Sequence, residues 1–98
     1  MIRHIVLFKF NSNVTEAERA AVVAGFKAMP AAIAEIRDLE AGLNVVASPR
    51  AYDLALIVTF ANRQDLERYV THPAHLPAAQ RGIDACAHIV SVDYETMH

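Results

Sequence analysis

Residues 2–10 have the sequence IRHIVLFKF, and this stretch decides the fold. It is apolar at nearly every position and rich in branched and aromatic side chains, which is typical of a strand buried on most of both faces. Residues Tyr52–Phe60 predict the clearest strand of the chain, because their large apolar side chains recur at every second position. The two stretches together predict a sheet whose central strands are covered on both sides.

A helix is predicted between these two strands. Thr15 and Glu18 form a capping-box signature, and apolar residues recur at helical spacing over residues 17–29. Because proline cannot donate a backbone hydrogen bond, Pro30 is expected to end or kink this helix. The first strand is therefore followed by a helix of about three turns.

The remaining elements follow in a regular order. Residues 39–45 alternate and predict a second strand, and Asn62 starts a second helix that Pro73 breaks. Residues 74–85 are ambiguous, because their alanines favour a helix while Pro77 and Gly82 interrupt it. Residues 88–95 alternate again and predict the last strand.

The order β-α-β-β-α-β predicts a ferredoxin-like α+β fold. We expect one domain over residues 1–98, with a four-stranded antiparallel sheet and the helices on one of its faces. His98, at the chain end, is expected to be disordered.

The sheet is predicted to be apolar on both faces, although its helices cover only one. The set assigned to the helix side is Val6, Phe8, Phe10, Leu54, Leu56, Val58, Phe60, Val90, Val92 and Tyr94. The opposite face is assigned Ile5, Leu7, Ala55, Ile57 and Ile89, with Arg3, Lys9, Asp53, Thr59, Ser91 and Asp93 around them. A dry centre with a polar border is typical of an interface. We therefore predict a homodimer through Ile5, Leu7, Ile57 and Ile89, whose burial contributes roughly 6 to 12 kcal/mol gross per chain.

Composition narrows the possible partners and compartments. The net charge is −2 and the nine Lys and Arg residues are scattered, which argues against nucleic acid. No stretch approaches the roughly 20 apolar residues of a membrane helix, so no membrane partner is expected. The single cysteine, Cys86, cannot form an internal disulfide, and the opening residues do not resemble a signal peptide. The chain is expected to be cytoplasmic.

Candidate chemistry is concentrated in the segment Tyr69–His75, with sequence YVTHPAH. We expect Pro73 to end the helix and let His75 turn back over its end. His4 has the parity of Val6 on the first strand, so it points to the helix side with Tyr69 and His75. Val6, Phe8, Leu54 and His72 are predicted to line the same pocket. An imidazole and a phenol in a dry pocket can move protons on a carbonyl substrate.

Structural roles are the alternative for the same residues. Tyr69 and His4 would then be satisfied core residues, and the His-Pro segment would cap the helix. His72 and His75 have a His-x-x-His spacing, but no nearby Asp, Glu or Cys completes a zinc set, so we predict no metal and no other cofactor. Nothing basic adjoins Cys86 in the sequence, so an inert thiol is expected.

The whole chain resembles the stress-responsive dimeric α+β barrel (Dabb) family. Four motifs carry the resemblance: the opening residues 2–10, Tyr52-Asp53-Leu54-Ala55-Leu56, the segment Tyr69–His75 and Val92-Asp93-Tyr94. The resemblance implies a ferredoxin-like protomer that forms a homodimeric barrel. It implies no single activity: most members have no assigned reaction, and some plant members are associated with stress tolerance.

One plant branch of the family resembles polyketide cyclases and performs an aldol-type ring closure. Its acid and base pair of a tyrosine and a histidine corresponds to Tyr69 and His75, and a first-strand histidine corresponds to His4. This branch carries another histidine on the third strand, where this chain has Leu54. The resemblance therefore does not imply that chemistry for this chain.

Three functions remain open at this stage. The first is a pocket for a small carbonyl or aromatic molecule, with His75 as base, Tyr69 as donor and His4 as orienter; an enzyme of this kind would be a cofactor-free acid/base lyase or cyclase. The second is a non-catalytic stress or assembly dimer whose histidines are structural. The third is a monooxygenase of the antibiotic-biosynthesis type, or a haem-degrading relative, with the same barrel architecture.

Overall fold

One antiparallel sheet with helices on a single face makes up the fold. The computed structural model describes residues 1–97, so the predicted disorder of His98 lies outside the described residues. Within them the elements are β1 (Ile2–Phe10), α1 (Glu16–Ala32), β2 (Ile36–Leu43), β3 (Leu54–Phe60), α2 (Arg63–Val70), α3 (His75–Ala85) and β4 (Cys86–Glu95). The strand order is β2-β3-β1-β4. The predicted ferredoxin-like fold is confirmed, and the ambiguous segment 74–85 contains a helix.

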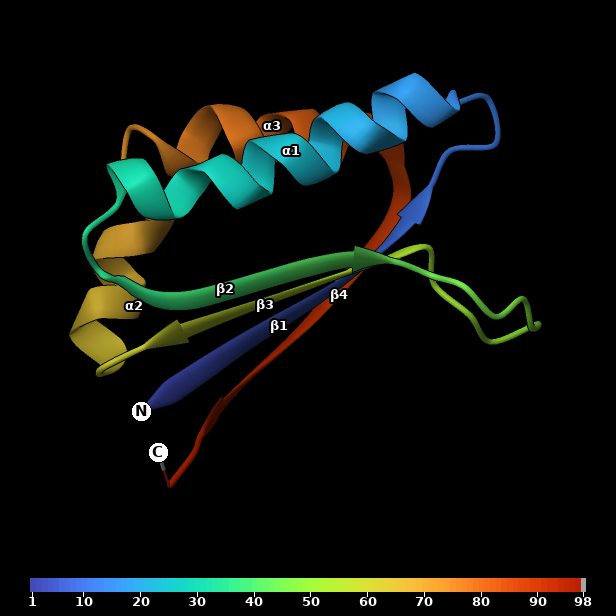
Figure 1. Cartoon of the computed structure of the whole chain (residues 1–98). Helices are drawn as coiled ribbons and strands as arrows, with labels where there is room; N and C mark the ends of the chain where they lie inside the picture. Colours follow the sequence, from blue (N-terminus) through green and yellow to red (C-terminus); the bar gives the residue numbers. More distant parts are fainter. Residues whose placement is uncertain (98) are drawn as a thin grey trace.

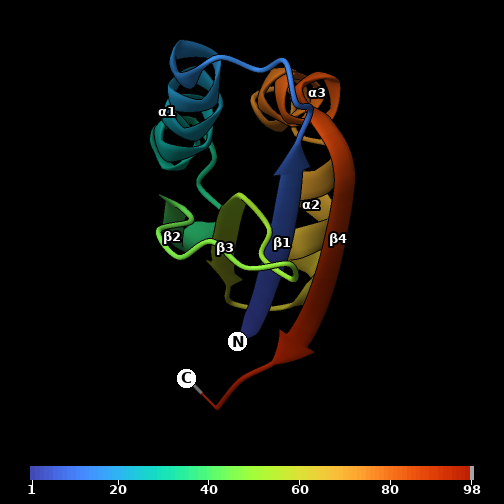
Figure 2. The ribbon, with the colours of Figure 1, turned by 90° about the vertical axis from the view of Figure 1, so that its right-hand side faces the viewer.

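The molecule has two layers, with the helices above the sheet (Figure 1). Seen from the side, α1 lies over β2 and β3, while α3 lies over β1 and β4 (Figure 2). The core fills the space between the layers with buried apolar side chains, among them Val6, Phe8, Val22, Phe26, Met29, Leu54, Leu56, Val58 and Phe60. The predicted helix side of β1 and β3 is therefore confirmed.

The first helix was predicted to end or kink at Pro30. It does not end there but continues to Ala32. It begins at the predicted capping box, where the Glu18 backbone N–H donates to Thr15 Oγ1 over 3.1 Å. Its last residue is Ala32, and the Ile33 N–H donates to the Met29 carbonyl over 2.9 Å. Met29 and Ile33 are buried. Their burial, together with this closing hydrogen bond, offsets the one bond that proline cannot make.

The second strand is displaced from its predicted range of 39–45 and occupies Ile36–Leu43. Its end is set by Asn44, whose Nδ2 donates to the Val46 carbonyl over 2.9 Å and so bends the backbone locally. The loop that follows projects beyond the sheet (Figure 1), and Val45 in it is almost fully exposed. The alternation of the sequence therefore extended past the strand into this loop.

The register of β4 reverses the predicted assignment of its two faces. It pairs Leu7 with Val90 and Ile5 with Val92, and directly paired residues of neighbouring strands point to the same face. The corrected positions are Val90, Val92 and Tyr94 on the face away from the helices, and Ile89, Ser91 and Asp93 on the helix side. Ile89, which was predicted to lie in the dimer interface, therefore lies on the opposite face of the sheet.

His88 also lies on the face away from the helices, because it pairs with Lys9. There its Nδ1 is hydrogen-bonded to the Tyr52 hydroxyl over 2.7 Å. The assignment failed because the apolar positions Val90, Val92 and Tyr94 were placed under the helices, whereas they lie on the opposite face. The alternation shows which positions share a face, but not which face the helices cover. Only the pairing with β1 decides between them.

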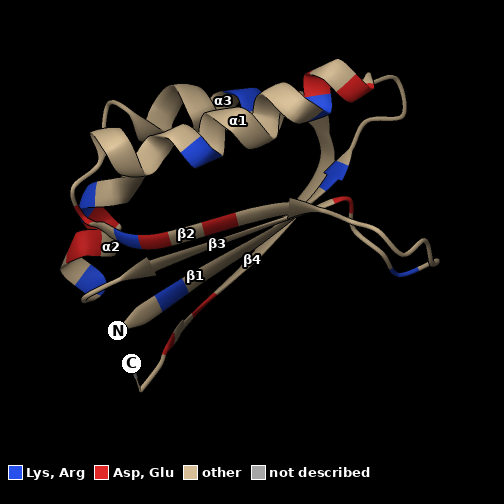
Figure 3. Ribbon diagram, viewed as in Figure 1, with Lys and Arg blue, Asp and Glu red and all other residues tan. Residues whose placement is uncertain are grey.

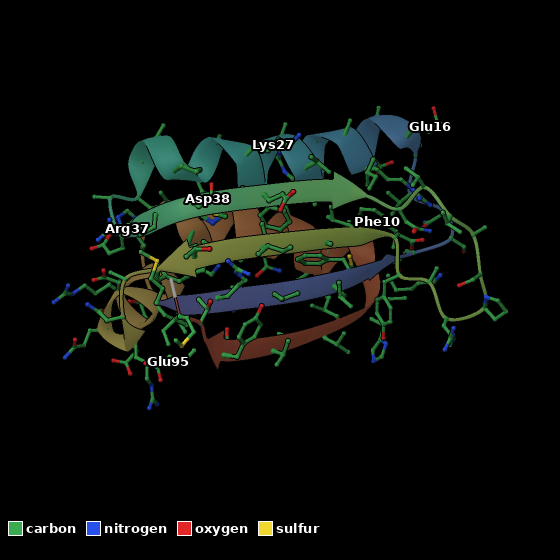
Figure 4. The ribbon with its side chains drawn as sticks, turned by 60° about the horizontal axis from the view of Figure 1, so that its bottom comes forward. Phe10, Glu16, Lys27, Arg37, Asp38 and Glu95 are labelled. Carbon is green, nitrogen blue, oxygen red and sulfur yellow. The ribbon has the colours of Figure 1, made fainter. Side chains whose placement is uncertain are left out.

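The sheet surface away from the helices, here called the outer face, has an apolar centre. Its central residues are Ile5, Leu7, Ala55, Ile57, Val90 and Val92. Figure 4 looks onto this face, with Arg37 and Asp38 at the start of β2 and Glu95 at the end of β4. Charged residues thus lie toward its borders, while its middle is aliphatic.

Charge is dispersed over the rest of the molecule. Lys and Arg residues occur on several separate elements and do not gather on one face (Figure 3). Among residues 1–97, no helix combines the length and the apolar character that crossing a bilayer requires.

Candidate functional site

A small cavity lies between the helices and the inner side of the sheet. Its volume is about 140 Å³. The lining comes from β1, α1, β3, α2, α3 and β4, and consists of His4, Val6, Phe8, Phe26, Leu56, Tyr69, His75, Ala79, Ile83 and Ile89. Seven of these are hydrocarbon side chains, so the three remaining rings are the polar groups that face the cavity. The fold thus brings His4, Tyr69 and His75 together from three separate elements.

Tyr69 is the most deeply buried of the three. Its side chain is 0 % exposed, and its hydroxyl has no hydrogen-bond partner among residues 1–97. Its ring packs against Phe60, with centroids 5.0 Å apart, and against His75, with centroids 4.2 Å apart. Burial raises the pKa of Tyr69 above its ordinary value. The phenol therefore remains protonated, and its hydroxyl keeps its capacity to donate a hydrogen bond.

His75 turns back over the end of α2, as its position after Pro73 predicts. Its Nδ1 lies 3.0 Å from the Val70 carbonyl oxygen. Because a carbonyl can only accept, Nδ1 carries the hydrogen and Nε2 keeps a lone pair in the neutral ring. Burial lowers the pKa of His75, and the nearby His4 and His72 lower it further, while the bond to Val70 opposes them. His75 is thus a neutral imidazole with one free acceptor at neutral pH.

His4 is held by a carboxylate that the sequence analysis placed on the wrong face. Its Nδ1 is hydrogen-bonded to Asp93 on the neighbouring strand, where the register pairs the two residues directly. An ionised carboxylate only accepts, so Nδ1 is again the protonated nitrogen and Nε2 is left free. The His4 ring lies 6.0 Å from that of Tyr69. Asp93 was not predicted to contact His4, because the face on which it lies depends on the register between β4 and β1.

This arrangement combines one donor with two acceptors in an apolar space. The Tyr69 hydroxyl can donate to a ligand oxygen, and the free nitrogens of His4 and His75 can accept a proton. A neutral imidazole can take up a proton, and a phenol can donate a hydrogen bond without losing its own proton. The cavity can therefore polarise a carbonyl and accept a proton from the same small molecule.

Two of the predicted lining residues lie elsewhere. Val6 and Phe8 line the cavity, but Leu54 is buried in the core outside its lining. His72 is also outside the lining, because its Nδ1 accepts a hydrogen bond from the Ala74 backbone N–H over 3.0 Å. Their places are taken by side chains that the sequence analysis did not single out for the pocket, such as Ala79 and Ile83 on α3.

The other titratable groups contribute little to this site. Within residues 1–97 no three His, Cys, Asp or Glu side chains gather as metal ligands would. Burial, and after it the neighbouring Asp53, raise the pKa of the Cys86 thiol. A thiol with a raised pKa is a poor nucleophile, which agrees with the inert role expected for it.

Larger hollows occur on the surface, but their chemistry is weaker. One of about 680 Å³ lies between the start of α1 and the loop after β2, and one of about 610 Å³ lies between α1 and α3. Both are bordered by charged side chains, such as Glu16 and Arg81, that are exposed to solvent. We place the candidate site in the smaller cavity, because its lining brings together one buried and two half-buried titratable rings from three separate elements.

The lowered pKa of His75 predicts a pH dependence of stability. Below about pH 6.5 an imidazole of the unfolded chain takes up a proton, while folded His75 does so only at a lower pH. The free energy of unfolding is therefore expected to fall between about pH 7 and pH 5. Urea titrations should show a shallower fall in His75→Gln than in the matched variant His88→Gln, whose ring lies on the outer face. Equal pH profiles in the two variants would contradict the assignment.

The sequence of this chain is similar to those of known proteins. The family model of the stress-responsive A/B barrel domain matches residues 2–96. An uncharacterized protein of Streptomyces coelicolor is 40% identical over 77 residues, which cover 76% of this chain and 79% of that protein.

Two solved structures illustrate the range of the fold. A dimeric protein of unknown function from Bacteroides fragilis, with a ferredoxin-like fold, is 35% identical; the match covers 97% of this chain and 95% of that one, with a TM-score of 0.81. A hydroxynitrile lyase from Passiflora edulis is 22% identical, with 99% and 94% of the two chains covered and a TM-score of 0.86. The second likeness is one of fold alone.

Proposed function

Because this chain belongs to the stress-responsive A/B barrel domain family, we propose that it is a homodimeric protein that binds a small carbonyl compound in the cavity between sheet and helices. In this proposal Tyr69 donates a hydrogen bond to the ligand oxygen. His75 acts as the base, and His4, oriented by Asp93, lies beside them as a second acceptor.

The observation that carries this proposal is the unpaired hydroxyl of Tyr69. A buried hydroxyl without a partner costs about 1 to 3 kcal/mol, so buried polar groups are nearly always paired. This hydroxyl is fully buried and belongs to a residue that lines the cavity. A ligand with an acceptor oxygen would supply the missing bond, which gives the cost a functional reason.

The two histidines support a reaction as well as binding. Each has its Nδ1 engaged, His75 by Val70 and His4 by Asp93, which leaves both Nε2 atoms free. A phenol that donates to a carbonyl and an imidazole that removes a proton are the two parts of general acid and base catalysis. Addition to a carbonyl and its reversal need these two parts and no cofactor. The Passiflora edulis protein of the same fold is named for a reaction of the lyase class.

The outer face supports the dimeric part of the proposal. Its aliphatic centre would leave a contiguous apolar patch in water, which is unusual for a monomer. A second copy of the chain would cover it with the same residues, as in any twofold interface. The related structure from Bacteroides fragilis is described as dimeric. The corrected interface set is Ile5, Leu7, Ile57, Val90 and Val92.

The alternatives fit the cavity less well. A purely structural dimer has no need of a cavity of about 140 Å³ next to an unpaired buried hydroxyl. That volume is far below the roughly 300 to 1,000 Å³ of sites for drug-sized ligands, which weighs against haem and against a long polyketide. Leu54, which replaces the third-strand histidine of the cyclase branch, also lies outside the cavity lining.

The test is the substitution Tyr69→Phe, which removes only the hydroxyl. We expect the free energy of unfolding to rise by about 1 kcal/mol, because an unsatisfied polar atom leaves the core. Binding of a small ketone such as acetophenone, followed by protein NMR, should weaken about tenfold, since one hydrogen bond in a dry site is lost. A gain in stability together with a loss of binding is characteristic of a functional group and not of a structural one.

Tyr94→Phe is the matched control, because its hydroxyl lies on the outer face of β4. It should leave ketone binding unchanged. The proposal is wrong if wild type and Tyr69→Phe bind acetophenone equally well, or if neither binds it. A loss of stability in Tyr69→Phe would instead point to a structural role for the hydroxyl.

A further inference from the structure

The size of the cavity sets a limit on what it can hold. An apolar cavity of about 150 Å³ accommodates a ligand of the size of benzene. The present cavity has a volume of about 140 Å³. One aromatic ring or a short branched chain fills such a space, whereas a second fused ring would require the walls to move.

One wall of the cavity has no room to retreat. Phe8 and Phe26 stand side by side in it, with ring centroids 5.3 Å apart. Behind them is Gly82 of α3, where an added Cβ would lie 3.2 Å from Phe26 Cζ and 3.4 Å from Phe8 Cε2. The two rings are thus already packed against the helix backbone. A ligand cannot displace them toward α3, which makes this side of the cavity rigid.

Another side of the cavity opens toward solvent. Ile83 on α3 and Ile89 on β4 both line the cavity and are both exposed. A side chain with both properties lies where a cavity meets the surface, so the mouth is between α3 and β4. Ile83, which is 55 % exposed, can be shortened without opening the core. Its side chain therefore limits how far a bound ligand can extend toward the mouth.

The polar lining limits the charge of the ligand. The lining includes neither Lys nor Arg. A carboxylate or phosphate would leave water without a fixed cation to pair with it, which is unfavourable in an apolar site. The buried hydroxyl of Tyr69 needs only an uncharged acceptor.

We infer that the site selects neutral carbonyl compounds with a single ring or a short chain, and that Ile83 sets the upper size limit. This inference rests on the proposed function and adds to it the class of ligand. The residues that enforce the limit are the Phe8 and Phe26 wall on one side and Ile83 at the mouth.

The experiment compares two ketones that differ by one ring, acetophenone and 2-acetylnaphthalene. Binding to the full-length protein is followed by NMR for wild type, Ile83→Ala and Leu76→Ala. Leu76 is a matched control, because it is also an aliphatic residue of α3, is 54 % exposed and does not line the cavity. Wild type should bind acetophenone at least about tenfold more tightly than the two-ring ketone, as is usual when a pocket lacks room for an added group.

Ile83→Ala should bring the preference for acetophenone close to equality, while Leu76→Ala should keep the wild-type ratio. Equal affinity of wild type for both ketones would overturn the size limit and leave the proposed function intact. An unchanged ratio in Ile83→Ala, or the same change in Leu76→Ala, would overturn the role of Ile83. If wild type binds neither ketone, the proposed function fails and the inference fails with it. Benzoate serves as the charged probe, and binding as tight as that of acetophenone would contradict the selection for neutral ligands.

Discussion

The variant Val92→Asp is expected to convert the dimer into monomers at micromolar concentration. Val92 lies in the centre of the outer face, paired with Ile5 on the neighbouring strand, and is 54 % exposed in the single chain. In the proposed dimer this side chain is covered by the partner subunit. An aspartate at this position would bury a carboxylate among aliphatic side chains without a cation to pair with it.

The twofold symmetry doubles this penalty, because each dimer contains the substitution twice. The lost burial and the desolvation of both carboxylates together cost at least about 4 kcal/mol, which corresponds to roughly a thousandfold in Kd. The folded protomer itself should lose little stability, since the introduced carboxylate would face water once the dimer separates. Light scattering coupled to size exclusion measures the change directly.

Leu76→Asp is the control for this experiment. Leu76 has the same exposed fraction, 54 %, but lies on α3 on the other side of the sheet. This variant should remain dimeric. A monomeric wild type, or a dimer that survives Val92→Asp unchanged, would remove the outer face from the proposed assembly.

The prediction of which side of each strand faces the helices succeeded for β1 and β3 and failed for β4. In β1 and β3 the helix side carries large aromatic and aliphatic side chains such as Phe8 and Phe60, so parity could be assigned from the sequence, and it is confirmed. In β4 the apolar positions Val90, Val92 and Tyr94 face away from the helices, and hydrophobic pattern alone does not distinguish a face covered by helices from one covered by a partner. That is why Ile89 and Val92 exchanged places.

Local sequence signals predicted the starts of the helices more accurately than their ends. The capping box of Thr15 and Glu18 and the cap at Asn62 both form as predicted, since a cap depends on residues only three positions apart. The helix does not end at Pro30, because the buried Ile33 beyond it holds the last turn in place. That contact is tertiary and has no local sequence signal.

The candidate site was predictable in its residue types and less so in its geometry. His4, Tyr69 and His75 line one cavity. Their convergence was predictable, because the alternation along β1 assigns His4 to the helix side and Pro73 lets His75 turn back over the end of α2. The hydrogen bond between His4 and Asp93 joins residues 89 positions apart and depends on strand register. The volume of the cavity depends on how Phe8, Phe26 and Gly82 pack together, which no pattern in the sequence reveals.

Asp93→Ala is expected to release His4 from its present tautomer. In the native chain the Asp93 carboxylate accepts a hydrogen bond from Nδ1, which fixes the hydrogen on that nitrogen and leaves Nε2 free toward a ligand. Without the carboxylate, nothing else in the described chain is hydrogen-bonded to Nδ1, so the hydrogen is free to move to Nε2. His4 would then present a donor where the ligand needs an acceptor.

Two-dimensional NMR that correlates the imidazole nitrogens with the ring protons reports which nitrogen of His4 carries the hydrogen. The spectra are recorded at about pH 9, where imidazole rings are ordinarily neutral. Wild type should show a single Nδ1–H tautomer, and Asp93→Ala should show a substantial Nε2–H population. For any reaction in which His4 accepts a proton at Nε2, the rate should fall in proportion to the fraction of His4 that no longer has a free Nε2.

Glu95→Ala separates this effect from a simple change in charge. Glu95 lies two positions further along the same strand, also loses one negative charge in the variant, and makes no hydrogen bond to His4. It should keep the Nδ1–H tautomer of the wild type. If Asp93→Ala also keeps that tautomer, another group orients His4, and Asp93 is only a surface residue. If both variants change it, the effect is electrostatic and does not depend on the hydrogen bond, so the ring of His4 would be held by packing against Tyr69 alone.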